Sequence, residues 1–239
     1  MLHGVATVGG KPPSPGLCAV TNTVLLAKGV VMIRRHWQLL GTVFVCVSAL
    51  ALWGCSDRQV RIHPPAIDAS AAGSGAIEQY DADGDGMIGG AELEKAGSIK
   101  SALKTLDTNG DGKVSAEEVT TRVQAWEDSK IGRMSLSCTV TRGGMPLSDA
   151  TVTFVPEKFL GEEVKAATGT TDKYGRAVLT APEAKPPGVA CGLYRVEISK
   201  EVGGGETIPA IYNTETILGQ EVAMGAAGME AGVFFNLTR

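Results

Sequence analysis

Histidine is scarce in this chain of 239 residues, which contains only His3, His36 and His63. Ser-His-Asp triads, Cys-His nucleophiles and multi-histidine zinc sites all need imidazoles that can meet other catalytic or ligating groups. Only His63 lies after Cys55, so these chemistries are excluded from that part of the chain. The "GGGET" segment at 203–207 lacks the lysine of a phosphate-binding loop. We therefore expect a protein that is not an enzyme, with a carboxylate-only active site as the alternative.

Acidic residues are absent before Asp57, and Lys and Arg form no cluster after Cys55. From Cys55 onward, 26 acidic residues stand against 18 basic ones, a formal net charge of −8. Nucleic-acid binding needs a concentrated basic surface, so this composition predicts no nucleic-acid partner and suits cations better. Aromatic residues are also few, at 5%, while glycine reaches 31 residues, which is typical of short strands and turns.

The longest apolar run lies between two basic residues, Arg34 and Arg35, and a cysteine, Cys55. A basic start, an apolar stretch and a small residue before the cysteine predict an export signal over residues 32–54. The ending "LWGC" resembles the lipobox of bacterial lipoproteins, which implies lipidation of Cys55 and a protein held at a membrane of the cell envelope. An uncleaved membrane anchor is the alternative, because the run approaches the length that spans a bilayer.

Two segments flank this signal. Residues 1–31 fit no part of it, and an export signal begins near its basic residues, so we expect Met32 to be the start and 1–31 to be an upstream mis-start. Residues 55–75 contain paired prolines and then Ala, Ser and Gly without an apolar period, which predicts a flexible spacer. We expect the folded part to begin near Ala76.

Two twelve-residue segments, "DADGDGMIGGAE" and "DTNGDGKVSAEE", repeat one acidic pattern. Calcium needs six to eight oxygen ligands around one point, and an EF-hand loop supplies them from positions 1, 3, 5, 7, 9 and 12, with Gly at position 6. The residues at the ligand positions are Asp81, Asp83, Asp85, Met87 and Glu92 in the first loop, and Asp107, Asn109, Asp111, Lys113, Ser115 and Glu118 in the second. Because two such matches so close together are not chance, we predict two bound Ca²⁺ ions.

Apolar residues flank both loops at helical spacing. The two expected helix stripes are Ile99, Leu103 and Leu106, and Val119, Val123 and Trp126. Ile88 and Val114 stand at position 8 of each loop, where paired EF-hands join through a short β-bridge. The sequence therefore predicts a paired EF-hand domain over residues 76–131.

The connection between the loops is short. Only 14 residues separate Glu92 from Asp107, and Gly97 interrupts them. The expected spacer ends just before Ile77, so we expect both helices of the first hand to be brief. This arrangement favours holding calcium over switching.

From about Met134 the apolar period changes to two, with turn residues between the runs. This pattern predicts an antiparallel β-sandwich over residues 134–239, and hence a multidomain α + β chain in which a small helical EF-hand pair comes first. The expected core residues are Val152, Phe154, Val178, Tyr194, Val196 and Ile198. A tight turn is expected at Asp172 and Gly175.

Several β segments resemble the carboxypeptidase regulatory-like domain, a prealbumin-type sandwich. They are "VTRGGMPLSDATVTFVP", "GTTDKYGRAVLT" and "PGVACGLYRVEIS". With "IPAIYNTET" and "VFFNL" they also resemble versions found in planctomycete surface lipoproteins. The resemblance implies a scaffold or binding module and no catalyst. An alternative function follows from it: a structural or adhesive surface module whose sandwich binds glycan or protein, with calcium only as a stiffener.

Two cysteines, Cys138 and Cys191, follow Cys55. In an exported protein such a pair is compatible with a disulfide. Two buried free thiols fit the sequence equally well, because spacing alone does not give the geometry of a bridge.

Overall fold

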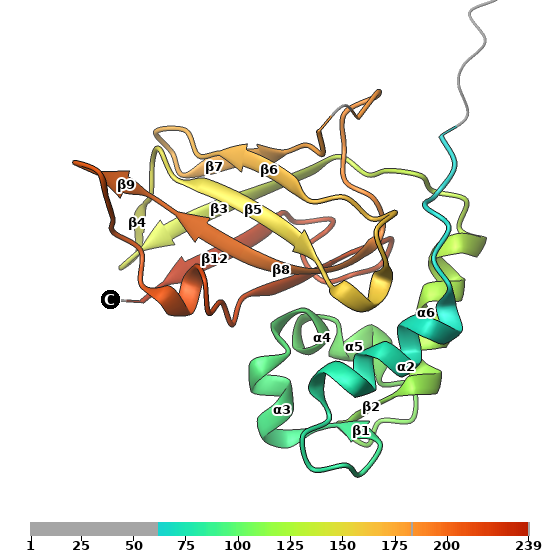
Figure 1. The fold of residues 1–239 in the computed structure, drawn as a ribbon. Coiled ribbons are helices and arrows are strands. Elements are labelled where there is room, and N and C mark those ends of the chain that lie inside the picture. Colours follow the sequence, from blue (N-terminus) through green and yellow to red (C-terminus); the bar gives the residue numbers. More distant parts are fainter. Residues whose placement is uncertain (1–61, 183, 239) are drawn as a thin grey trace, which may run out of the picture. The chain divides into compact units, whose positions relative to one another are not determined.

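The computed structural model describes residues 62–182 and 184–238. Helices come first, ending at Asp128, and the longer strands begin at Leu136 (Figure 1). Both regions belong to one compact unit, Val60–Arg239. The expected α + β organisation, a helical EF-hand region followed by a β-rich region, is confirmed.

Several predictions concern residues that lie outside the described ranges. They are the export signal, the start at Met32 and the lipidation of Cys55. In residues 62–182 and 184–238, no helix combines the length and the apolar character that crossing a bilayer would require.

Five helices and one small ladder build the helical region. They are α2 (Ala69–Tyr80), β1 (Met87–Ile88), α3 (Gly90–Lys95), α4 (Gly97–Ser101), α5 (Leu103–Leu106), β2 (Val114–Ser115) and α6 (Ala116–Asp128). The predicted stripes form its core, since Ile99, Leu106, Val119 and Val123 are fully buried. Leu103 packs against that core while remaining partly exposed.

Helix α2 corrects the prediction of a flexible spacer that reaches residue 75. It begins at Ala69, because the Asp68 carboxylate caps it by accepting a hydrogen bond from the Ala71 amide at 2.9 Å. Its small residues allow close packing on α6: a Cβ added at Gly73 would come within 2.3 Å of Thr120 Oγ1. The entering helix of the first hand therefore has 12 residues and is not brief. The exiting helix α3 is short, as expected, with 6 residues.

The β region contains two four-stranded sheets. Its strands are β3 (Leu136–Arg142), β4 (Met145–Pro146), β5 (Thr151–Pro156), β6 (Ala167–Thr170), β7 (Arg176–Leu179), β8 (Gly192–Ser199), β9 (Glu201–Val202), β10 (Gly205–Glu206), β11 (Gly219–Val222) and β12 (Val233–Leu237), with 3₁₀ turns η2 (Lys158–Leu160) and η3 (Ala210–Tyr212). One sheet has the order β11-β8-β5-β6; in the other, β3 pairs with β12, β4 and β7. All described pairs are antiparallel except β12 with β3, which run parallel.

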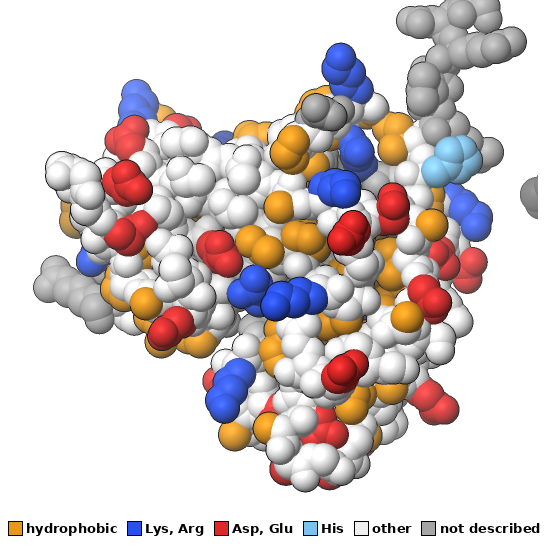
Figure 2. All heavy atoms as spheres, in the orientation of Figure 1, with side chains coloured by type: hydrophobic (Ala, Val, Ile, Leu, Met, Phe, Trp, Pro, Cys, Tyr) orange, Lys and Arg blue, Asp and Glu red, His pale blue; other side chains and the backbone are white. Residues whose placement is uncertain are grey.

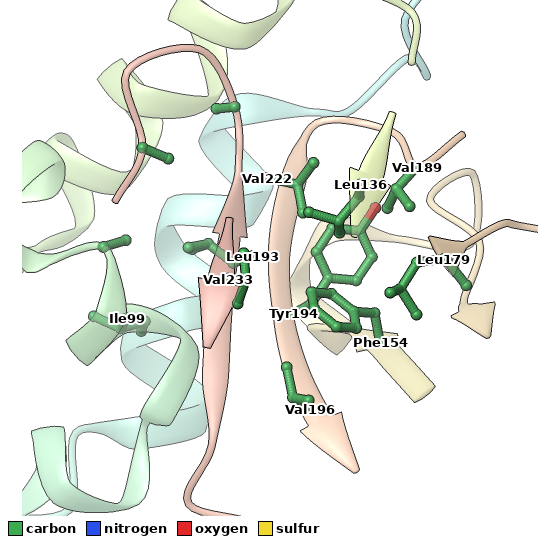
Figure 3. Packing of buried hydrophobic residues seen from close by; sticks show 14 of the residues in the cluster. Ile99, Leu136, Phe154, Leu179, Val189, Leu193, Tyr194, Val196, Val222 and Val233 are labelled. Carbon is green, nitrogen blue, oxygen red and sulfur yellow. The ribbon is translucent and has the colours of Figure 1, made fainter. Parts of the chain in front are cut away.

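A core of alternating side chains lies between these sheets. Phe154 of β5 meets Phe235 of β12 with ring centroids 6.2 Å apart, and it meets Tyr194 of β8 at 5.9 Å. Figure 3 shows Phe154 and Tyr194 beside one another in this core. The Phe154–Phe235 contact is edge-to-face and the Phe154–Tyr194 contact is tilted, and such aromatic pairs stabilise the core beyond the burial of their area.

The prediction is wrong for one of the expected core residues of the sandwich. Val178 is 64% exposed, because in β7 the buried positions are Ala177 and Leu179. The other expected core residues of the sandwich, Val152, Phe154, Tyr194, Val196 and Ile198, are fully buried. The expected tight turn is present: Asp172 accepts the amide of Arg176, and Gly175 has a φ of 75°.

Cys138 and Cys191 form no disulfide with each other; both are free thiols. Cys138 lies on β3 and Cys191 directly precedes β8, which belongs to the other sheet. The Cys191 thiol donates to the Ile131 carbonyl at 3.8 Å. Burial raises the pKa of Cys138 to about 12 and that of Cys191 to about 11, so both are poor nucleophiles.

Candidate metal centre

The two acidic loops lie side by side because β1 and β2 join them. Ile88 pairs with Val114, and Met87 pairs with Ser115, in an antiparallel ladder. Ile88 and Val114 are fully buried, which confirms the predicted β-bridge. Several acidic side chains are visible at this end of the molecule in the space-filling view (Figure 2). Any ion held by one loop therefore lies beside the ion site of the other.

In the first loop, three carboxylates face one another. One oxygen from each of Asp81, Asp83 and Asp85 lies within 4.8 Å of the others. The loop backbone keeps them there: Asp81 accepts the amides of Gly84 and Gly86 at 2.7 and 2.9 Å. Both glycines have φ near 80°, a left-handed conformation that favours glycine. Three like charges at this spacing repel, so a divalent cation among them relieves the repulsion.

Glu92, at position 12, closes the first loop. One of its oxygens accepts the amide of Ala82 at 2.7 Å, and the other accepts the amide of Gly89 at 3.0 Å. The hydrogen bond from Ala82 connects α3 to the start of the loop, and the one from Gly89 caps the start of α3. A pocket beside the loop is lined by Asp83, Asp85 and Glu92. The oxygen-only donor set fits calcium, which prefers carboxylate and carbonyl ligands.

A lysine from the second loop reaches into the first. Lys113 Nζ lies 2.6 Å from an oxygen of Asp85, and its stem covers Gly89, where an added Cβ would meet Lys113 Cγ at 2.8 Å. Position 9 of the first loop thus has no side chain because Lys113 occupies the space. Position 7 of an EF-hand loop contributes its backbone carbonyl to the ion, so the side chain of Lys113 is free for this second role.

The second loop repeats the arrangement with one amide in place of a carboxylate. Asp107 accepts the amides of Gly110 and Gly112 at 2.6 and 2.8 Å. Asn109 donates its side-chain amide to Asp111 at 3.0 Å. Because Asn109 is neutral, the carboxylates of the second loop repel one another less than the three of the first loop do.

Glu118 is held more firmly than its counterpart Glu92. Its side chain and Ser115 form a reciprocal capping box at the start of α6, with the Ser115 amide donating at 2.9 Å. Thr108 donates its amide to the other oxygen of Glu118 at 3.0 Å. Glu118 is 7% exposed, so it is the most buried of the expected ligand carboxylates.

Hydrogen bonds lower the pKa of three loop carboxylates, Asp85, Glu92 and Glu118. The Lys113 ammonium lowers the pKa of Asp85, and the amides of Gly89 and Ala82 lower the pKa of Glu92. Burial opposes ionisation of Glu118, but hydrogen bonds from Ser115 and Thr108 outweigh it, and its pKa is also lowered. Carboxylates are the charged form that binds a metal, so these loops are prepared for a cation at neutral pH.

The EF-hand family matches this region at residues 75–96 and 99–123. The chain carries an EF-hand pair. The pair supports calcium binding by the segment that holds both loops. No curated protein and no solved structure matches the chain.

Sequence reasoning missed two buried carboxylates of the β region that contact the hands. Glu157 and Glu221 are each 1% exposed and accept hydrogen bonds from helical residues. They stand in "VPEKF" and "GQEVA", and nothing in those segments distinguishes them from surface acids. Only the tertiary contacts reveal them.

Proposed function

We propose that the protein binds two calcium ions, one in each EF-hand loop, and that the ions mainly stabilise the hands. The observation that carries the proposal is the cluster of Asp81, Asp83 and Asp85 in a loop of the matched family. The second loop has Asp107, Asn109 and Asp111 at the same positions. The first ion would be held by these carboxylates, the Met87 carbonyl and Glu92. The second would be held by Asp107, Asn109, Asp111, the Lys113 carbonyl, Ser115 and Glu118.

Calcium binding in this arrangement stabilises the folded state by mass action, because the unfolded chain does not bring the ligands together. The carboxylates of each loop repel one another until a cation neutralises them. Exported EF-hand modules often bind calcium with a Kd of about 10⁻⁴ to 10⁻³ M. Stabilisation by a bound calcium ion is useful where calcium is abundant, as it is outside the cytosol.

The experiment is a calorimetric calcium titration of the full chain and of single variants. Glu92→Gln should remove one of two bound ions and Glu118→Gln the other, because each variant loses the bidentate ligand of one loop. Glu94→Gln is the matched control, since Glu94 is an exposed neighbour whose partner is Lys100. Unchanged stoichiometry in both loop variants would refute the assignment.

We also propose that the chain is exported and anchored by lipid at Cys55. The support is the order of basic, apolar and small residues from 32 to 55. The β region resembles the carboxypeptidase regulatory-like domain. We therefore include in this proposal that the β region is a scaffold that contacts a protein or glycan. Labelling cells with a fatty-acid probe tests the anchor: wild type should be labelled and Cys55→Ala should not. Equal labelling of both would exclude lipidation at Cys55.

A further inference from the structure

Each of two buried carboxylates of the β region receives hydrogen bonds from the helices around the calcium loops. Glu157 follows β5, and Glu221 lies on β11. Both are 1% exposed. Burying a carboxylate costs free energy unless hydrogen bonds or charges compensate it, so the donors that surround each one matter.

Glu157 is compensated by neutral donors from two helices. Tyr80 at the end of α2 donates its hydroxyl at 2.9 Å, and Gln79 donates its side-chain amide at 3.0 Å. Ser98 of α4 donates its hydroxyl at 2.5 Å. Tyr80 directly precedes Asp81, the first expected ligand. Glu157 therefore fixes the last turn of the helix that enters the first loop.

Glu221 connects the two helices on either side of the second loop. Thr105 of α5, two residues before Asp107, donates its hydroxyl at 2.6 Å. On α6, the Arg122 guanidinium donates at 2.6 Å and the Trp126 indole at 3.0 Å. Arg122 also supplies the opposite charge. A single carboxylate thus ties the entering helix to the exiting helix.

Two glycines bring the backbone of α4 against that of β11. A Cβ added at Gly97 would lie 2.2 Å from the Ile217 carbonyl oxygen, and one at Gly219 would lie 2.1 Å from the Ser98 amide nitrogen. Gly97, which interrupts the connection between the hands, is therefore the residue that permits this contact. The packing leaves little freedom for α4 to move relative to β11.

We propose that Glu157 and Glu221 are positioning residues for calcium, and that the β region uses them to hold the hands in the arrangement that binds the ions. The inference rests on the proposed calcium function. The closing of an EF-hand loop on its ion is coupled to the placement of its two helices, and Glu221 favours one placement of α5 and α6. Because coupling is reciprocal, calcium in turn strengthens the contact between the helices and β11.

The test measures calcium affinity loop by loop in the full chain. Glu118→Gln leaves the first loop to be titrated alone, and Glu92→Gln leaves the second. Glu221→Gln should weaken the second loop about fivefold or more and the first loop less, within the usual range of coupling between sites. Glu157→Gln should do the reverse. Glu201→Gln, an exposed acid of β9, is the control and should change neither.

Milder variants keep the test valid if a buried Gln prevents folding. Thr105→Val removes one donor from Glu221, and Tyr80→Phe removes one from Glu157, while each keeps the size of the side chain. Each should weaken the loop that it adjoins. Hydrogen exchange provides a second readout: calcium should slow exchange at residues 219–222 in wild type, and less so in Glu221→Gln.

The outcomes separate this inference from the function beneath it. If wild type binds two ions and the folded variants bind them as Glu201→Gln does, the positioning role is wrong and the calcium function stands. Equal weakening of both loops by either variant would also overturn it, because general damage has no preference for a loop. Absence of calcium binding by wild type would overturn the proposed function and this inference with it.

Discussion

The helical and β regions treat their carboxylates differently. In the first EF-hand loop, Asp81, Asp83 and Asp85 face one another in an exposed loop. In the β region, Glu206 and Asp172 stand apart. Asp172 is satisfied by hydrogen bonds from its own turn, and Glu206 by donors that include Ser199 of β8. The loop carboxylates also accept amides of their own loop, but three grouped like charges repel and favour a cation. A carboxylate that stands alone with protein donors is a structural element. The same residue type thus indicates a metal site in one region and a turn in the other.

Removing calcium should produce the largest loss of stability, because the grouped carboxylates of both loops then lose the ion that neutralises them. At a calcium concentration of about 100 times Kd, each site stabilises the fold by roughly 2.7 kcal/mol. For a chain of this size, that corresponds to about 5 to 10 °C in melting temperature for each site, and so to roughly 10 to 20 °C when excess chelator removes both ions. Calorimetric melting with calcium and with chelator checks this. An identical melt in both would contradict the dependence of the helical region on an ion.

Gly73→Ala tests the packing of the helical region apart from its ion. Alanine normally stabilises an exposed helix position relative to glycine. Here its Cβ would collide with Thr120 and with the carbonyl of Ala116, so we expect a loss of about 1 to 3 kcal/mol in the free energy of unfolding. Urea unfolding measures it, with Ser70→Ala, an exposed site on the same helix, as the neutral control. A stabilised Gly73→Ala would show that α2 does not pack closely on α6.

Lys113→Gln changes the charge around the grouped carboxylates. Lys113 pairs with Asp85 and so competes with calcium for that ligand. Removing the competitor should tighten binding to the first loop about two- to fivefold at low salt, as expected for an exposed ion pair, and less at high salt. Titration of the first loop alone checks this, with Lys100→Gln as the control. Weaker binding would mean that Lys113 supports the loop instead.

Glu206 gives the smallest effect and belongs to the β region. Burial opposes its ionisation, but hydrogen bonds from Ser199 and from the amides of Ile208, Lys200 and Thr207 lower its pKa from 4.5 to about 2. The folded pKa lies below the unfolded one, so its contribution to stability is complete above pH 4.5 and is lost as the pH falls towards 2. Glu206→Gln should therefore be less stable than wild type at pH 7, with the difference shrinking across that window. A difference independent of pH would exclude this role.

The sequence predicted the parts of the site that depend on local spacing. Ligand positions within a twelve-residue loop, and the β-bridge at Ile88 and Val114, follow from short-range rules. The structure confirms the bridge and brings Asp81, Asp83 and Asp85 together. The alternation in β5 and β8 likewise predicted buried Phe154 and Tyr194. Local patterns succeed where the physical constraint is itself local.

Features that depend on distant partners could not be predicted. The Ala, Ser and Gly residues before Ala76 resemble a spacer, and only the nearness of α6 shows that small side chains serve helix packing. Val178 lies in a four-residue strand, where a shift by one residue reverses which side chains are buried. Glu157 lies 78 residues from its helical partner Gln79, and Glu221 lies 95 residues from Trp126. No local pattern predicts contacts at such separations.

A calcium titration of the full wild-type chain tests the central claim most directly. Equilibrium dialysis or calorimetry should find two calcium ions bound per chain, and none when Glu92→Gln and Glu118→Gln are combined. Such a result would establish both loops as ion sites at neutral pH. No saturable calcium binding to the folded wild-type chain would contradict the account.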